Sequence, residues 1–197
     1  MPSIAEIQYY LTGAWRLMTG RTDGIRMLDI SSDGFWNSFF AIVVAAPALF
    51  VGWIGIVNEI GSDPVAPGPL SILLRLALID LGAWVLPLGA MALAARPAGI
   101  SDRFVQYVVA SNWASALIAW LMLPAALLRM ISPASADIAS ILSLGLFAFS
   151  MALTWRLTNA VIGKGPAIAT AVFGGMFVAS LAVIFALQAI LGLYVPG

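Results

Sequence analysis

Five long apolar runs, separated by short polar segments, organise the chain. They extend over about residues 35–57, 70–95, 104–128, 138–155 and 167–194. A run of about 20 apolar residues is long enough to cross the hydrocarbon core of a bilayer as a helix. The pattern therefore predicts an all-α integral membrane protein. Residues 35–197 are expected to form a five-helix transmembrane bundle, and residues 1–34 a cytoplasmic, interfacial segment.

Polar, aromatic and proline residues mark the expected ends of these helices. Asp33 is placed to cap the first helix at its amino terminus. Trp53 falls near the other end of the first run, where an indole is expected at the level of the lipid headgroups. Pro124 is expected to break the third helix. The polar sequence TWRLTNAVIGKGP, which ends at Pro166, predicts a loop after a rather short fourth helix.

The residues before the first long run predict an amphipathic helix in the membrane interface. Ser3 and Glu6 have the spacing of a capping box, which marks a helix start. Apolar residues then recur at steps of three and four: Ile4, Ile7, Leu11, Trp15 and Met18. Two interpretations stay open, since this face can contact lipid directly or pack on the rim of the bundle.

Basic residues are concentrated on one side of the predicted membrane. The amino-terminal segment and the loops after the second and fourth helices carry Arg16, Arg21, Arg26, Arg96, Arg103, Arg156 and Lys164. The loops on the other side carry only Arg129. Short loops rich in Lys and Arg stay in the cytoplasm. The distribution predicts a multi-pass protein of the inner (plasma) membrane with a cytoplasmic amino terminus and an external carboxyl terminus.

The composition excludes several classes of function, chiefly through the residue types that the chain lacks. Hydrophobic residues make up 62% of it and charged residues 9%, whereas globular domains are about 25% charged. Nine basic and nine acidic residues leave no cationic excess for nucleic acid, so the lipid bilayer is the expected partner. Cysteine and histidine are absent, which removes thiolate nucleophiles, the commonest metal ligand and the usual general base. We therefore expect no catalytic residue, no metal and no cofactor.

One segment imitates half of a calcium-binding loop. Asp29, Ser31, Asp33 and Gly34 follow the first part of the EF-hand pattern. The twelfth position, which should supply a bidentate glutamate, is Phe40. We therefore expect no calcium site here.

Two charges inside the second apolar run are the strongest candidates for a functional site. An ionisable residue at that depth costs roughly 2.5 to 3.5 kcal/mol, so it needs a partner or a task. Arg75 and Asp80 are about 140° apart around the helix and do not share a face. They are expected about 30 Å and about 22 Å from the cytoplasmic end of the second helix. Asn112 of the third helix is expected nearer the cytoplasmic side, too far from Asp80 for contact.

The predicted intramembrane polar site comprises Asp80, Arg75, Gln188 and Glu59. In a functional interpretation, Asp80 lines a cavity for an ion or a proton. In a structural one, Arg75 reaches the outer headgroups or pairs with Glu59, while hydroxyl and amide groups hold Asp80. An intramembrane aspartyl protease is excluded, because no second deep carboxylate faces Asp80.

The last apolar run carries a stripe of small residues at every fourth position: Ala167, Ala171, Gly175 and Ala179. Such a stripe lets another helix approach closely. Packing inside the bundle is the favoured interpretation, and a homo-oligomer or another protein partner is the alternative.

Two segments resemble the Yip family of membrane proteins. The third helix, from Tyr107 through Asn112 to Pro124, is similar, as is the polar turn of Asn159, Gly163 and Lys164 before an alanine-rich last helix. Yip proteins have five spans, a cytoplasmic amino terminus and, in eukaryotes, a role in Rab-GTPase interaction. The resemblance implies a non-enzymatic, membrane-organising or partner-binding role, although the amino-terminal segment is short for a GTPase-binding region. The alternative is a small permease or channel with Asp80 in an ion or proton pathway.

Overall fold

The computed structural model describes residues 1–61, 67–131 and 136–193, which are helical and contain no strand. Five helical stretches are long and apolar enough to cross a membrane, so the all-α class and the five apolar helices are confirmed. The elements are α1 (Ile4–Met18), η1 (Thr22–Met27), α2 (Ser32–Ser38), α3 (Ala41–Ile60), α4 (Pro69–Ala94), η2 (Ser101–Arg103), α5 (Phe104–Ile131), α6 (Ala136–Ile162) and α7 (Pro166–Leu191).

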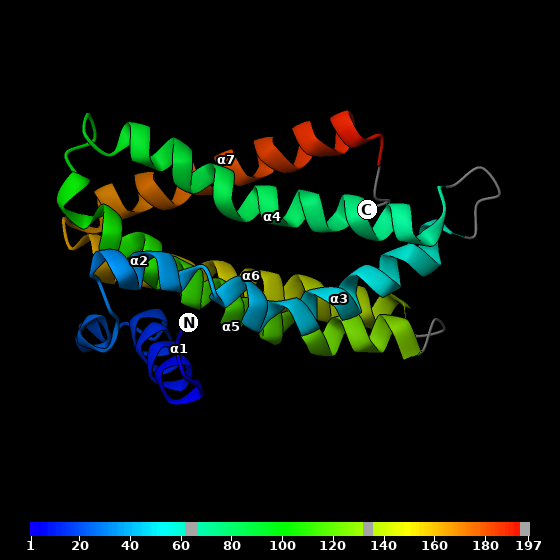
Figure 1. Cartoon of the computed structure of the whole chain (residues 1–197), viewed down its shortest axis with the longest axis horizontal. Coiled ribbons are helices and arrows are strands. Elements are labelled where there is room, and N and C mark those ends of the chain that lie inside the picture. The colour runs from blue at the N-terminus through cyan, green and yellow to red at the C-terminus, as the bar shows by residue number, and fades with distance from the viewer. Residues whose placement is uncertain (62–66, 132–135, 194–197) are drawn as a thin grey trace.

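The five apolar helices run side by side in two layers (Figure 1). One layer is the pair of α4 and α7, and the other contains α2 with α3, α5 and α6. Within the second layer α5 packs between α3 and α6, and α6 also contacts α7 across the layers. The candidate site described below lies between the layers.

One end of the bundle collects the basic side chains of two loops. Lys164, between α6 and α7, forms an ion pair with Asp102, between α4 and α5, at 2.7 Å. The Lys164 ammonium group also donates to the carbonyl group of Gly99. We call the end that carries these loops the basic end, and the end where α3 and α5 terminate the far end.

Helix α1 lies beside the basic end, across the direction of the long helices (Figure 1). One face of its carboxyl-terminal half is buried against α5 and α6, with Leu17 0% and Met18 1% exposed. The ring of Tyr10 lies 5.3 Å from that of Trp113 of α5. The predicted helix and its capping box are confirmed. Of the two contacts that the sequence left open for this helix, lipid and the rim of the bundle, the structure shows packing on the bundle.

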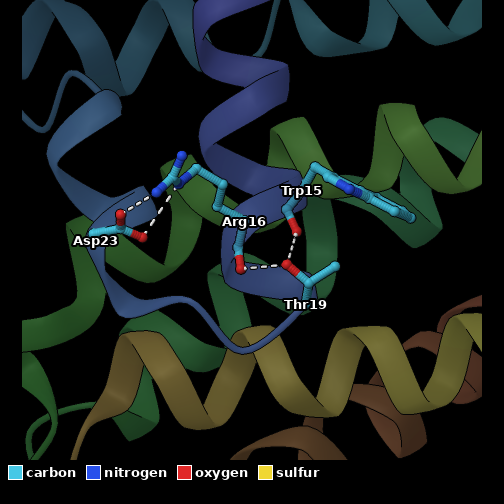
Figure 2. Close-up of polar contacts among 4 residues, drawn as sticks. All are labelled: Trp15, Arg16, Thr19 and Asp23. Atoms are coloured by element: carbon cyan, nitrogen blue, oxygen red, sulfur yellow. Dashed lines mark hydrogen bonds and ion pairs between the residues drawn. The ribbon is translucent and has the colours of Figure 1, made fainter.

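A tight turn folds η1 back against α1 (Figure 2). The guanidinium group of Arg16 binds the carboxylate of Asp23 and holds the pKa of that carboxyl group below its usual value. The Thr19 hydroxyl group donates to the carbonyl groups of Trp15 and Arg16 at 3.0 and 2.9 Å, which satisfies two carbonyl groups at the end of α1. Gly24 then lies so close to α1 that an added Cβ would overlap the carbonyl oxygen of Gly13.

The residue that caps the first apolar helix is two positions earlier in the chain than the predicted cap, Asp33. Ser31 is the cap, because its hydroxyl oxygen accepts from the Gly34 backbone N–H at 3.1 Å. Asp29 in turn accepts from the Ser31 backbone N–H at 3.0 Å. The prediction for Asp33 is therefore wrong: the calcium-like residues start a helix, and Asp33 lies in its first turn, where a negative charge is favourable.

The fourth apolar helix is longer than predicted and ends at Ile162. The hydroxyl groups of Thr154 and Thr158 each donate to the carbonyl group four residues earlier, at 2.8 Å, so they need no loop or water. Leu157 and Ile162 are 0% exposed in the core beneath α1. The predicted end of this helix was therefore wrong, because the two threonine hydroxyl groups in the polar sequence are satisfied within the helix.

Three prolines lie inside continuous helices. Pro124 does not break α5, which continues to Ile131, so this prediction is also wrong. Pro47 and Pro87 lie within α3 and α4 in the same way. Neighbouring groups in a bundle compensate for the backbone hydrogen bond that a proline removes.

Candidate functional site

A cavity of about 600 Å³ lies between the two layers. Its volume is within the range of about 300 to 1,000 Å³ that is typical of small-molecule sites. Side chains of α3, α4, α5, α6 and α7 line it, most of them apolar or aromatic. The polar side chains among them, besides the aromatic ones, are Asp80, Ser111, Asn112, Ser115, Thr154 and Ser180.

Asp80 lies on the cavity wall near the middle of α4 and is partly exposed. Its Oδ2 accepts a hydrogen bond of 2.7 Å from Nε1 of Trp53, on the opposing helix α3. Trp53 is therefore turned into the bundle, and its predicted role as a headgroup anchor is wrong. A carboxylate in an apolar setting needs a hydrogen-bond donor. The indole N–H is such a donor and adds no second charge.

A second set of hydrogen bonds crosses the wall one helical turn further toward the basic end. Nε1 of Trp84 donates to Oδ1 of Asn112 at 2.9 Å, and Nδ2 of Asn112 donates to the hydroxyl oxygen of Ser38 at 2.8 Å. Asn112 and Ser38 are 1% and 0% exposed. The network joins α4, α5 and α2, and it explains why Asn112 is unavailable to Asp80.

Arg75 is held away from Asp80 by the end of α7. Its Nη1 donates to the carbonyl oxygens of Leu191 and Gly192, at 2.6 and 3.3 Å. These carbonyl groups form the negative end of a helix dipole, which favours a cation. Arg75 therefore stabilises the α4–α7 pair at the far end of the bundle.

The predicted polar site is not assembled as a group. Among the described residues, the cavity lining includes Asp80 but not Arg75, Gln188 or Glu59. Glu59 is exposed near the end of α3, and Gln188 is partly buried in the last turns of α7. The structure therefore does not bring the four residues together around this cavity, and a functional role for Asp80 stays a prediction.

The small-residue stripe borders a second cavity. Ala171, Gly175 and Ala179 line a groove of about 390 Å³ between α4 and α7 at the basic end, and Ala167 is exposed. A Cβ added to Gly175 would meet no other atom within 4 Å. The stripe therefore makes no close helix contact at Gly175 within this chain, and its use by a second copy or another partner stays a prediction.

The cavity residues that the prediction missed are mainly aromatic. Trp84 is four residues after Asp80 and so shares its helix face, a signal that was present in the sequence. Trp53 is 27 residues from Asp80, and no local pattern indicates their contact. In residues 1–61, 67–131 and 136–193, no group of three or more acidic, histidine or cysteine side chains is placed to hold a metal ion.

No family model, no curated protein and no solved structure matches this chain. The similarity to the Yip family therefore stays a prediction, and the function is argued from the cavity itself.

Proposed function

We propose that the protein is a non-enzymatic, multi-pass inner-membrane protein that acts as a small permease, with Asp80 in its pathway. The observation that carries the proposal is the cavity between the layers, with one carboxylate on a wall of mostly apolar and aromatic side chains. A scaffold needs no such space, because close packing stabilises a bundle and an empty cavity costs stability. A charged side chain that lines an intramembrane cavity typically marks a substrate or ion pathway.

The distribution of charge and apolar surface supports the membrane location. Large apolar side chains are exposed on the outside of the helices, including Leu144 (69%), Phe185 (65%) and Ile190 (76%). An apolar surface of this extent suits lipid rather than water. The basic end carries α1 and most of the Lys and Arg residues, which supports a cytoplasmic amino terminus and an external carboxyl terminus.

Cysteine accessibility tests whether the cavity holds water. The chain has no cysteine, so single cysteines can be introduced without background. Ser180 lines the cavity, whereas Ala182, on the same helix, is exposed on the outer surface and outside the cavity lining. In protein reconstituted into lipid, iodoacetamide should modify Ser180→Cys about tenfold faster than Ala182→Cys, because a thiol ionises in water and not in hydrocarbon. Mass spectrometry measures both rates, and equal rates would contradict a water-filled pathway.

A second candidate function, membrane organisation or partner binding of the Yip-like kind, is favoured by one observation on α1. Ile4 (76%), Tyr9 (51%) and Trp15 (45%) stay exposed although the other face of α1 is buried in the bundle. An exposed apolar and aromatic face at this level suits the interface of the bilayer or a partner.

Substitution of the exposed face separates this function from the permease. In Tyr9→Ser/Trp15→Ser the buried Leu17 and Met18 stay in place, so we expect an unchanged melting temperature. The organising role predicts that a partner co-purified from native membranes is lost from this variant and retained by Gln8→Ser, at an exposed polar position of α1. Equal recovery from both variants would exclude the exposed face as the working part.

A further inference from the structure

We propose that the central cavity recognises a lipophilic organic cation: a compound with one positive charge and an apolar, preferably aromatic, body. This inference rests on the proposed function, since it names the class of substrate that the permease would accept. It follows from the charge of the cavity, the hydrogen bonds of the nearest arginine and the kind of side chain on the walls.

The charged side chains that line the cavity, among the residues that the structure describes, are of one sign, negative. Asp80 is the only carboxylate among the lining residues that the structure describes, and they include no lysine or arginine. The described part of the chain contains no ion pair that involves Asp80. Because charges interact strongly across an apolar medium, an unpaired carboxylate selects against anions and favours a cationic ligand.

The nearest arginine on α4 is already occupied. Arg75 is only five residues from Asp80, yet its guanidinium group binds the carbonyl groups of Leu191 and Gly192. The space that an internal counter-ion would fill is therefore left to a ligand. Trp53 contributes one neutral N–H to Oδ2 of Asp80, which orients the carboxylate without cancelling its charge.

The walls suit the rest of such a ligand. Six aromatic side chains line the cavity: Trp53, Trp84, Tyr107, Phe147, Phe173 and Phe177. The faces of aromatic rings attract cations and also stack on apolar rings. The rings of Phe173 and Phe177 are stacked with their centroids 6.5 Å apart, and Phe147 lies 6.4 Å from Phe177. Met122, Met151 and Met176 add flexible side chains that adapt to different ligand shapes.

Two probes of the same shape and opposite charge test the proposal. Tetraphenylphosphonium is a cation, and tetraphenylborate is an anion with a nearly identical apolar body. Equilibrium dialysis of the full-length protein in detergent should show saturable binding of the cation, with the anion bound about 10- to 100-fold more weakly. Absence of saturable cation binding, or equal affinity for the two probes, would overturn the proposal.

Variants locate the charge that discriminates between the probes. Asp80→Asn keeps the size and the hydrogen bond from Trp53 but removes the charge, so it should weaken binding of tetraphenylphosphonium about 10- to 100-fold. Asp137→Asn, at an exposed position at the start of α6, should bind as the parent does. Unchanged affinity in Asp80→Asn would overturn the proposal, and if that variant does not fold, the comparison of the two probes on the parent protein decides. Iodoacetamide is neutral, so the cysteine experiment does not depend on the charge of the ligand. If the cation did not bind but Ser180→Cys were modified rapidly, the cationic substrate would be excluded and the proposed permease function would still hold.

Discussion

Replacement of Asn112 with alanine should lower the free energy of unfolding by about 2 to 4 kcal/mol. Asn112 is 1% exposed, and its amide group joins Trp84 of α4 to Ser38 of α2. Without it the Trp84 N–H loses its acceptor in an apolar wall, and the removed side chain leaves a void. A buried polar group without a partner costs about 1 to 3 kcal/mol, and the void adds to that.

The measurement is unfolding of the purified protein in mixed micelles, followed by tryptophan fluorescence. Ser111→Ala is the matched control, because Ser111 is the adjacent residue and its hydroxyl group donates only locally, to the carbonyl group of Val108 at 3.0 Å. We expect the control to change the free energy of unfolding by about 0.5 kcal/mol or less. If the two variants were equally stable, the network would not hold the layers together.

Replacement of Gly24 with valine should detach η1 from α1. A side chain at this position overlaps the carbonyl oxygen of Gly13, which is backbone and cannot rotate away. The Cβ would also lie 3.0 Å from Cβ of Arg16 and from Cγ of Leu17. Overpacking of this kind costs about 1 to 3 kcal/mol, and here it acts on a contact between two short elements. We therefore expect loss of the Arg16–Asp23 pair and local opening of the segment from Thr22 to Met27.

Hydrogen exchange measured by mass spectrometry reports this opening. Exchange should accelerate in peptides of α1 and η1 and stay unchanged in α4 and α7, which do not pack extensively against η1. Gly55→Ala in α3 is the control, because a Cβ there meets no atom within 4 Å. Alanine at an open helical position should be neutral or stabilise by up to about 1 kcal/mol. Unchanged exchange in Gly24→Val would mean that the α1–η1 contact tolerates a side chain.

Helices α4 and α7, which form one layer of the bundle, are packed unevenly along their length. Near the middle of α4 the two helices approach so closely that a Cβ on Gly82 would overlap the side chain of Leu187, and at the far end Arg75 adds its bonds to the end of α7. Toward the basic end the same helices border the groove that the small-residue stripe lines.

Much of the architecture was predictable because it depends on local patterns. Five apolar runs of sufficient length, a capping box at Ser3 and Glu6 and the clustering of Lys and Arg residues are each visible in a few consecutive residues. Errors arose where a polar side chain has a local alternative to water. Thr154 and Thr158 bond to their own helix, and Ser31 rather than Asp33 caps α2.

The sequence by itself determined that this chain forms five long apolar helices and that Asp80 lies deep within one of them. Only the tertiary structure decided what Asp80 faces, which is the cavity and the indole of Trp53 on α3. Among the described residues Asp80 forms no ion pair with Arg75, which bonds to the end of α7 instead. The physical reason is rotation. Hydropathy defines the length and depth of a helix, but the direction of each side chain depends on packing with helices that are distant in sequence.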